Sequence, residues 1–241
     1  MMYIRNLLFI FFYKVKYKLN IRNYKLYSFE RIMEKTFKKE KDFSFIQVGA
    51  NDGVSFDDLY SFVTNRNSKG VVIEPIKEYF NELVANYKNF DNIKPVNMAV
   101  YINKTVLKIH KINPDRISNY PDWVKGIASL DKEHHKKTDI SQEDMITEDV
   151  NADHLMKIVR KNYNGDIKKL DFLQVDTEGF DYQVIKMIDF EIMTPKILKF
   201  EHVNVTEKEI KELNVMLSNK GYKMFNEGGD TIAIDLKRVL L

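Results

Sequence analysis

The sequence predicts an α/β protein built on an open, mostly parallel β-sheet. Three short apolar segments support this prediction, because residues 43–48, 70–74 and 170–175 each resemble a strand that is buried on both faces. Helical patterns start near residue 55 and cover residues 78–87, after the first and second of these segments. Strands that alternate with helices are typical of a parallel sheet covered by helices.

Further elements follow along the chain. Residues 93–100 predict a third strand, and residues 105–110 alternate enough to predict an edge strand hairpinned onto it. Thr206, followed by Glu209, predicts the capping box of a later helix. A strand over residues 196–200 precedes this helix, and residues 221–225 and 231–235 predict a closing antiparallel hairpin around Gly228 and Gly229.

Composition limits the classes of function. The 241 residues are 44% hydrophobic, which is enough for the core of one domain. Cysteine is absent, so the sequence excludes a disulfide framework, a thiolate zinc site and a cysteine nucleophile. Only 7 of the 38 basic residues are arginine, the residue that leads nucleic-acid readout. We therefore expect no nucleic-acid partner and a cytoplasmic location.

The N-terminal part, residues 1–41, is predicted to be a basic, apolar helical segment in front of one domain of residues 42–241. Residues 1–45 contain 11 Lys and Arg against 4 Asp and Glu, although the net charge of the whole chain is only +3. The apolar run over residues 7–13 is far shorter than the roughly 20 residues that span a bilayer. No small-residue cleavage site follows the run, so a signal peptide is not expected.

An apolar stripe at helical spacing crosses this segment, and a second helix is predicted over residues 24–39. The stripe consists of Ile4, Leu8, Phe11, Val15 and Leu19. Two interpretations remain open. The stripe packs on the domain or on a second subunit, which would make a homo-oligomer, or residues 3–19 contact a membrane surface peripherally, at the inner face of the membrane.

The first strand ends in a loop that contains Gly49, Asn51, Asp52 and Gly53. A strand that leads through glycines to a helix N-terminus lets the backbone approach a nucleotide-like ligand closely. The spacing is not G-x-G-x-x-G, and a carboxylate at position 52 would repel the pyrophosphate of a dinucleotide. The same charge favours S-adenosylmethionine, which carries an ammonium and a sulfonium group.

The second strand supports a nucleoside ligand. It ends at Glu74, 21 residues after Gly53, where a carboxylate can accept both ribose hydroxyls of an adenosine. Pro75 then stops the strand, because proline has no N–H group for the sheet.

Four motifs carry a family resemblance. Their order and spacing resemble those of the FkbM family of S-adenosylmethionine-dependent methyltransferases, over about residues 43–235. The motifs are residues 48–53 (VGANDG), 73–75 (IEP), 97–100 (NMAV) and 176–179 (DTEG). The resemblance implies a class I methyltransferase fold, which is Rossmann-like. It also implies S-adenosylmethionine as cofactor and, in most members, O-methyl transfer onto sugars or glycan-like compounds.

The cofactor site is expected to use the glycine loop, both strand ends and part of a long irregular segment, residues 111–148. Ser129 resembles a serine of the family, so this segment is expected to lie over the methyl donor. His134 and His135 in the same segment are expected to be solvated rather than metal ligands. The predicted cofactor-binding residues are Gly49, Asn51, Asp52, Gly53, Glu74, Pro75, Ala99, Ser129 and Asp176.

The predicted catalytic residues follow later strands. A sugar hydroxyl is weakly acidic, so it needs a base or a metal to lose its proton during attack. His202 is predicted to be this base, facing Asp176 from the end of a strand, and Asp176 or Glu178 would orient it or the acceptor. Alternatively, Glu178 only supports the next helix N-terminus. A divalent cation held by Asp176, Glu201 and His202 is a less favoured alternative.

The sequence therefore predicts an O-methyltransferase that acts on a saccharide or nucleotide-sugar acceptor, as in a bacterial surface-glycan precursor. Two rival functions are considered. A NAD-dependent sugar oxidoreductase would use the same half of the fold, but the chain lacks G-x-G-x-x-G and a suitable Tyr-x-x-x-Lys pair. A non-catalytic scaffold that binds S-adenosylmethionine or a membrane is disfavoured by the presence of Asp52, Glu74, Asp176 and His202.

Overall fold

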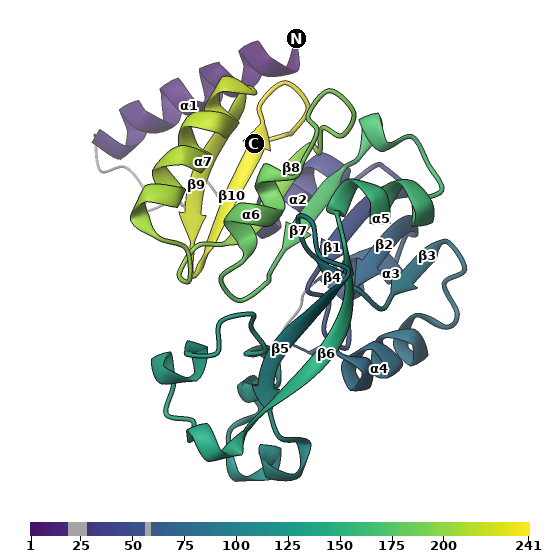
Figure 1. Ribbon diagram of the computed structural model, residues 1–241. Helices are drawn as coiled ribbons and strands as arrows, with labels where there is room; N and C mark the ends of the chain where they lie inside the picture. The colour runs from purple at the N-terminus through teal and green to yellow at the C-terminus, as the bar shows by residue number, and fades with distance from the viewer. Residues whose placement is uncertain (19–27, 56–58) are drawn as a thin grey trace.

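The computed structural model describes residues 1–18, 28–55 and 59–241. A seven-stranded sheet forms its centre, in the order β3-β2-β1-β7-β8-β10-β9 (Figure 1). The first five strands in this order are parallel, and β10 is antiparallel to both of its neighbours. The predicted mostly parallel α/β fold with a C-terminal antiparallel hairpin is confirmed. The strands are β1 Asp42–Val48, β2 Asn67–Ile73, β3 Ile93–Val96, β7 Phe172–Val175, β8 Ile197–Glu201, β9 Tyr222–Glu227 and β10 Asp230–Asp235.

Helices cover both faces of this sheet (Figure 1). Successive residues of β1 enter different hydrophobic clusters, because strand side chains alternate between faces. Ile46 and Val48 pack with α5, α6 and α7, whereas Phe43 and Phe45 pack with α2, α3 and α4. The predicted capping box opens α7. The helices are α1 Met2–Lys18, α2 Phe29–Phe37, α3 Leu59–Thr64, α4 Lys77–Tyr87, α5 Leu155–Asn162, α6 Asp181–Lys186 and α7 Glu207–Asn219.

The predicted third strand is divided between two sheets. Its first half is β3, but its end, β4 Ala99–Val100, belongs to a three-stranded sheet in the order β4-β6-β5. Asn97 lies at the break, and its side-chain amide donates to the carbonyl oxygens of Glu74 (2.9 Å) and Pro75 (2.8 Å). Asn97 therefore holds the backbone in place directly after β2.

The predicted hairpin of residues 105–110 with the third strand is wrong. Instead, β5 Val106–Ile112 pairs with β6 Met145–Asp153. The sequence pattern missed β6, because only two of its nine residues are buried and its apolar signal is weak. The intervening chain forms the short 3-10 helices Pro114–Asn119, Asp122–Gly126, His134–Lys137 and Gln142–Asp144. We refer to residues 105–153 as the β5–β6 lobe.

The predicted N-terminal helix is present, but its stripe does not pack on the domain. Asn6 is fully buried and donates from its side chain to the carbonyl oxygens of Leu236 (2.9 Å) and Val239 (2.8 Å). Phe9 and Ile10 on the same side of α1 join the cluster beneath α2. The predicted stripe faces outward, and its last member, Leu19, lies outside the described residues, as do residues 24–27 of the predicted second helix.

Within the ranges that the structure describes, no helix is long and apolar enough to cross a membrane.

Replacing Asn6 tests how α1 is attached. Asn6→Ala should lower the free energy of unfolding by about 1–3 kcal/mol, because it leaves two buried carbonyl groups without their donor. Leu8→Ala on the exposed side of the same helix is the control and should change it by less than about 0.5 kcal/mol. Urea denaturation measures both values, and equal effects would mean that the Asn6 contacts do not hold the helix.

Candidate functional site

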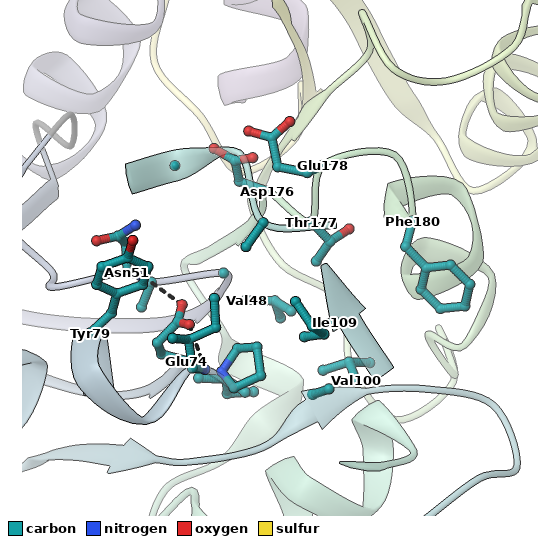
Figure 2. Close-up of a pocket in the computed structure, with 18 of the residues that line it drawn as sticks. Val48, Asn51, Glu74, Tyr79, Val100, Ile109, Asp176, Thr177, Glu178 and Phe180 are labelled. Atoms are coloured by element: carbon teal, nitrogen blue, oxygen red, sulfur yellow. Dashed lines mark hydrogen bonds between the residues drawn. The ribbon is translucent and has the colours of Figure 1, made fainter. Parts of the chain in front are cut away.

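A pocket of about 380 Å³ opens at the carboxyl ends of β1, β2 and β7 (Figure 2). Ligands of open parallel α/β sheets bind at this edge. Its floor comes from the loops after these strands, and the β5–β6 lobe supplies the opposite wall. The predicted residues Gly49, Asn51, Glu74, Pro75, Ala99, Asp176 and Glu178 all line it.

Glu74 is held at the centre of this edge. It is only 5% exposed, and its carboxylate accepts the backbone N–H groups of Asn51 (2.9 Å) and Ile76 (2.8 Å), drawn as dashed lines in Figure 2. Burial raises the pKa of Glu74 to about 7, although both N–H groups favour the ionised form. Each oxygen keeps a further lone pair, so the group can still accept hydrogen bonds from a ligand.

The glycine loop brings backbone close to Glu74. Asn51 has a φ of 49°, and its side-chain amide donates to the carbonyl oxygen of Lys125 in the lobe (2.9 Å). A Cβ atom at Gly49 would lie only 1.6 Å from the carbonyl oxygen of Asp176. Position 49 therefore requires glycine, because any side chain would push β1 and β7 apart.

Two predicted loop residues do not line the pocket. The carboxylate of Asp52 accepts the Ser55 hydroxyl (2.6 Å) and the N–H groups of Val54 and Ser55, so it caps the following turn. Burial alone would raise the pKa of Asp52, but these hydrogen bonds lower it. Gly53 lets the loop approach α4, because a Cβ atom there would be 2.6 Å from Leu83 Cδ1. The carboxylate of Asp52 was predicted to favour a cationic ligand, but it accepts hydrogen bonds from its own loop instead.

Apolar side chains form the other walls of the pocket. Val48 and Val100 come from the strands, Ile109 from β5 and Phe180 from the loop before α6 (Figure 2). Trp123, residues 125–128 and Leu130 of the lobe also line the pocket. The apolar side chains of these walls offer a surface on which a ring system can pack.

Ser129 supports the pocket from behind the lining. It is 3% exposed and forms an antiparallel bridge with His110, which holds residues 125–130 against β5. Its hydroxyl donates to the carbonyl oxygen of Glu178 (2.8 Å). Ser129 therefore ties the lobe to the loop after β7.

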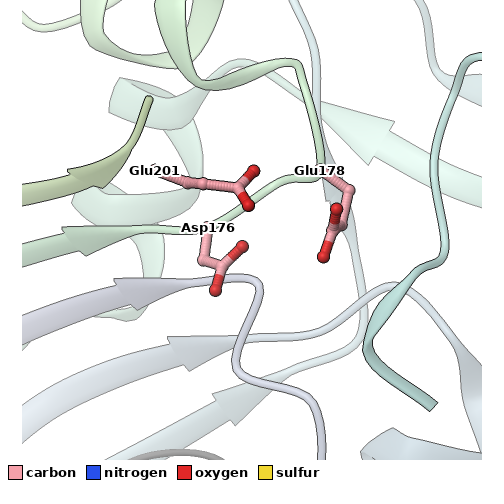
Figure 3. Close-up of side chains that lie close together, drawn as sticks. All are labelled: Asp176, Glu178 and Glu201. Atoms are coloured by element: carbon pink, nitrogen blue, oxygen red, sulfur yellow. The ribbon is translucent and has the colours of Figure 1, made fainter. Parts of the chain in front are cut away.

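Three carboxylates meet beside the pocket (Figure 3). Asp176 and Glu178 follow β7, and Glu201 ends β8; one oxygen of each lies within 4.8 Å of the others. The side-chain amide of Asn204 donates to Glu178 (3.1 Å) and to Glu201 (2.9 Å). We call Asp176, Glu178 and Glu201 the carboxylate cluster.

Burial, followed by the repulsion between like charges, raises the proton affinity of Asp176 and Glu201. The Asp176 side chain is exposed to the pocket, but the surrounding protein shields it from bulk water. This desolvation, followed by the charges of Glu178 and Asp181, raises its pKa well above its usual range. Burial and the charge of Glu178 likewise raise the pKa of Glu201. The cluster therefore binds a proton more readily than isolated carboxylates do, which favours a role in proton transfer.

The β5–β6 lobe supplies a histidine that contacts Glu178, although the sequence predicted that this histidine is solvated. His134 and His135 are 4% and 5% exposed, so the predicted solvated loop is wrong at these positions. Nε2 of His134 lies 3.1 Å from Oε2 of Glu178. A short 3-10 helix turns the histidines inward, and the periodicity of the sequence carries no signal for such a turn.

His202 does not join the cluster. Its Nδ1 atom lies 3.3 Å from Oγ1 of Thr231 on β10, and the residue is not part of the pocket lining. His202 was predicted to face Asp176, but it contacts Thr231 instead. The predicted metal set of Asp176, Glu201 and His202 is therefore wrong. Glu178 occupies the place in the cluster that was expected for His202.

Comparison with known proteins identifies one family. The model of the methyltransferase FkbM domain matches residues 47–224. No curated protein matches the chain.

Several solved structures are similar. Methyltransferase FkbM from Methylobacillus flagellatus KT is 12% identical with a TM-score of 0.49, over 80% of this chain and 43% of its own. The METTL16 methyltransferase domain is 14% identical with a TM-score of 0.46, over 86% of this chain and 64% of its own. Precorrin-6y C5,15-methyltransferase from Geobacter metallireducens GS-15 is 10% identical with a TM-score of 0.40, over 88% and 90%. The chain thus spans less than two thirds of the first two structures.

Neutralising one carboxylate tests the electrostatics of the cluster. A pKa that is raised in the folded state means that stability is lost as pH rises from the ordinary pKa through the raised one. Glu201→Gln keeps an acceptor for Asn204 and removes this loss, so the variant should gain thermal stability over the wild type, more at pH about 8 than at pH about 5. Calorimetry at both values measures the difference, and an equal change at both would contradict the assigned repulsion.

Proposed function

Because the chain belongs to the FkbM family of S-adenosylmethionine-dependent methyltransferases, we propose that it methylates a hydroxyl group of a saccharide. Its sheet order is that of the class I methyltransferase fold. One observation carries the proposal: a single pocket is lined by a buried carboxylate suited to a ribose, Glu74, and by Asp176 and Glu178 of the carboxylate cluster. The first group serves a nucleoside cofactor, and the second serves an acceptor.

The residues of the pocket fit the cofactor. Glu74 retains lone pairs for two ribose hydroxyls, and the volume of about 380 Å³ lies in the range of small-molecule sites. Val48, Val100 and Ile109 offer apolar surface to an adenine. Asp176 and Glu178 place carboxylate oxygens at the other end, where they can accept hydrogen bonds from the ammonium group.

The proposed chemistry divides between cofactor and protein. When bound, S-adenosylmethionine supplies a methyl group on a positively charged sulfur that is already a good leaving group. The chain has to orient the acceptor hydroxyl and take up its proton as the oxygen forms its bond to carbon. Asp176 is the proposed base, because it lines the pocket and because desolvation, followed by the charge of Glu178, raises its pKa. Glu178, held by His134 and Asn204, is proposed to orient the acceptor.

The carboxylate cluster also favours a polyhydroxylated acceptor. Ionised carboxylates only accept hydrogen bonds, and neighbouring hydroxyls of a sugar can donate to several of them at once. A phosphate group placed directly at Glu178 and Glu201 would be repelled. We therefore propose that the sugar of a nucleotide-linked or glycan-linked acceptor, such as a bacterial surface-glycan precursor, enters here with any phosphate held farther away.

A divalent cation is the alternative use of the cluster. Carboxylate oxygens are the ligands that Mg²⁺ and Ca²⁺ prefer, and a bound cation would acidify a sugar diol in place of a base. If a carboxylate of the cluster acts as the base, removing divalent cations with a chelator should leave the activity unchanged. If the cluster holds a cation, the chelator should abolish the activity.

Binding of S-adenosylhomocysteine, the demethylated product, tests the cofactor site. The wild type should bind it, and Glu74→Ala should weaken binding by at least about tenfold, because two charge-assisted hydrogen bonds are lost. Glu82→Ala, which removes an exposed glutamate from α4, is the control and should bind normally. Isothermal titration measures all three, with NAD as the comparison ligand. Tighter binding of NAD would favour the sugar oxidoreductase, and no binding of either would favour a scaffold.

Transfer of a labelled methyl group to free sugars and nucleotide sugars tests the acceptor half. Asp176→Asn should lower kcat by roughly 10²–10⁴-fold, because it removes the base. The control His202→Gln should retain activity within a few-fold. The activity should persist in a chelator; loss that Mg²⁺ restores would assign the cluster to a metal instead. Transfer to protein or nucleic acid, with none to any saccharide, would reject the proposed acceptor.

A further inference from the structure

The outer side of α1 is an uncovered apolar surface. Its residues include pairs that are three or four positions apart in the sequence, so they lie on one side of the helix. Ile4 is 63% exposed and Phe11 61% exposed, although such side chains are usually covered. We call this set the α1 face: Ile4, Leu7, Leu8, Phe11, Phe12 and Val15.

The attachment of α1 fixes the direction of this face. Asn6 anchors the opposite side of the helix through two buried hydrogen bonds, and Phe9 and Ile10 pack beside it. The helix cannot turn to bury the α1 face without breaking these contacts. A helix that is apolar on both sides is normally covered on both sides, so the α1 face requires a partner surface.

Charge identifies the kind of surface. The sequence of α1 contains Arg5, Lys14, Lys16 and Lys18 and no acidic residue. The cationic groups of Arg31 and Lys35 on α2 lie 5.4 and 5.6 Å from the centre of the Phe9 ring, on the anchored side of α1 rather than on the α1 face. Burial lowers the pKa of Lys35, and the nearby charges of Arg31 and Arg5 lower it further.

This charge disfavours a second copy of the chain and favours an anionic lipid surface. In a symmetric dimer through the α1 face, two basic segments would face each other and repel. Anionic lipid headgroups attract lysine and arginine, while aromatic and aliphatic side chains enter the boundary of the acyl chains. Phe11, Phe12 and Leu8 supply such side chains, and Lys14 is exposed next to them.

We propose that the α1 face docks the protein on an anionic membrane surface as a peripheral, in-plane helix. Figure 1 shows α1 at one end of the molecule and the β5–β6 lobe, which closes the pocket, at the other. Docking through α1 therefore leaves the pocket accessible. The inference does not depend on the reaction, because it uses no residue of the site.

Binding to lipid vesicles tests the proposal. The wild type should sediment with vesicles of phosphatidylcholine and phosphatidylglycerol at least tenfold more strongly than with phosphatidylcholine alone, and added salt should weaken binding. Leu8→Glu combined with Phe11→Glu should abolish binding, because it places two negative charges in the apolar face. Val215→Glu, at an equally exposed apolar position on α7, is the matched control and should bind as the wild type does.

The fold and the oligomeric state of the double variant are measured as well. The melting temperature and S-adenosylhomocysteine affinity of the double variant should equal those of the wild type, because both substituted side chains are exposed. Light scattering should show the same mass for the wild type and the double variant. Binding that is independent of phosphatidylglycerol, binding that survives the double substitution, or a dimer that the double substitution dissociates would overturn the proposal, the last in favour of a second copy of the chain.

Discussion

The buried carboxylate of Glu74 joins the segments on which the pocket depends. It receives the N–H group of Asn51 from the loop after β1 and that of Ile76 from the start of α4. Asn97 fixes the same corner by donating to the carbonyl oxygens of Glu74 and Pro75. Burying a carboxylate costs free energy, and the pKa of about 7 reflects this cost. A carboxylate kept in such a place is typical of a functional site.

The parts of the fold that were predictable from sequence are those whose signal is local. β1, β2 and β7 are short apolar runs because both of their faces are buried, and Glu74 was predicted because it follows directly where β2 ends. β6 was missed because one side of it faces solvent and its sequence is mostly polar. The burial of His134 depends on Glu178, which is 44 positions away, so no local pattern could predict it.

Neighbouring positions explain the error at His202. Glu201 and His202 are adjacent, and side chains of an extended chain point alternately to opposite sides. The sequence identifies the strand end, but it does not decide which of the two residues meets Asp176. A similar limit applies to α1, where periodicity identified the apolar stripe but the buried Asn6 determines that the stripe faces outward. In both cases tertiary contacts, rather than local preference, set the direction of a side chain.

A crystal structure with S-adenosylhomocysteine would show whether one pocket holds a nucleoside cofactor between Glu74 and the carboxylate cluster. Both ribose hydroxyls should donate to Glu74, and the sulfur should lie at the end of the pocket formed by Asp176 and Glu178. A nucleoside bound away from Glu74, or a sulfur directed away from Asp176, would mean that the cofactor does not bind in this way.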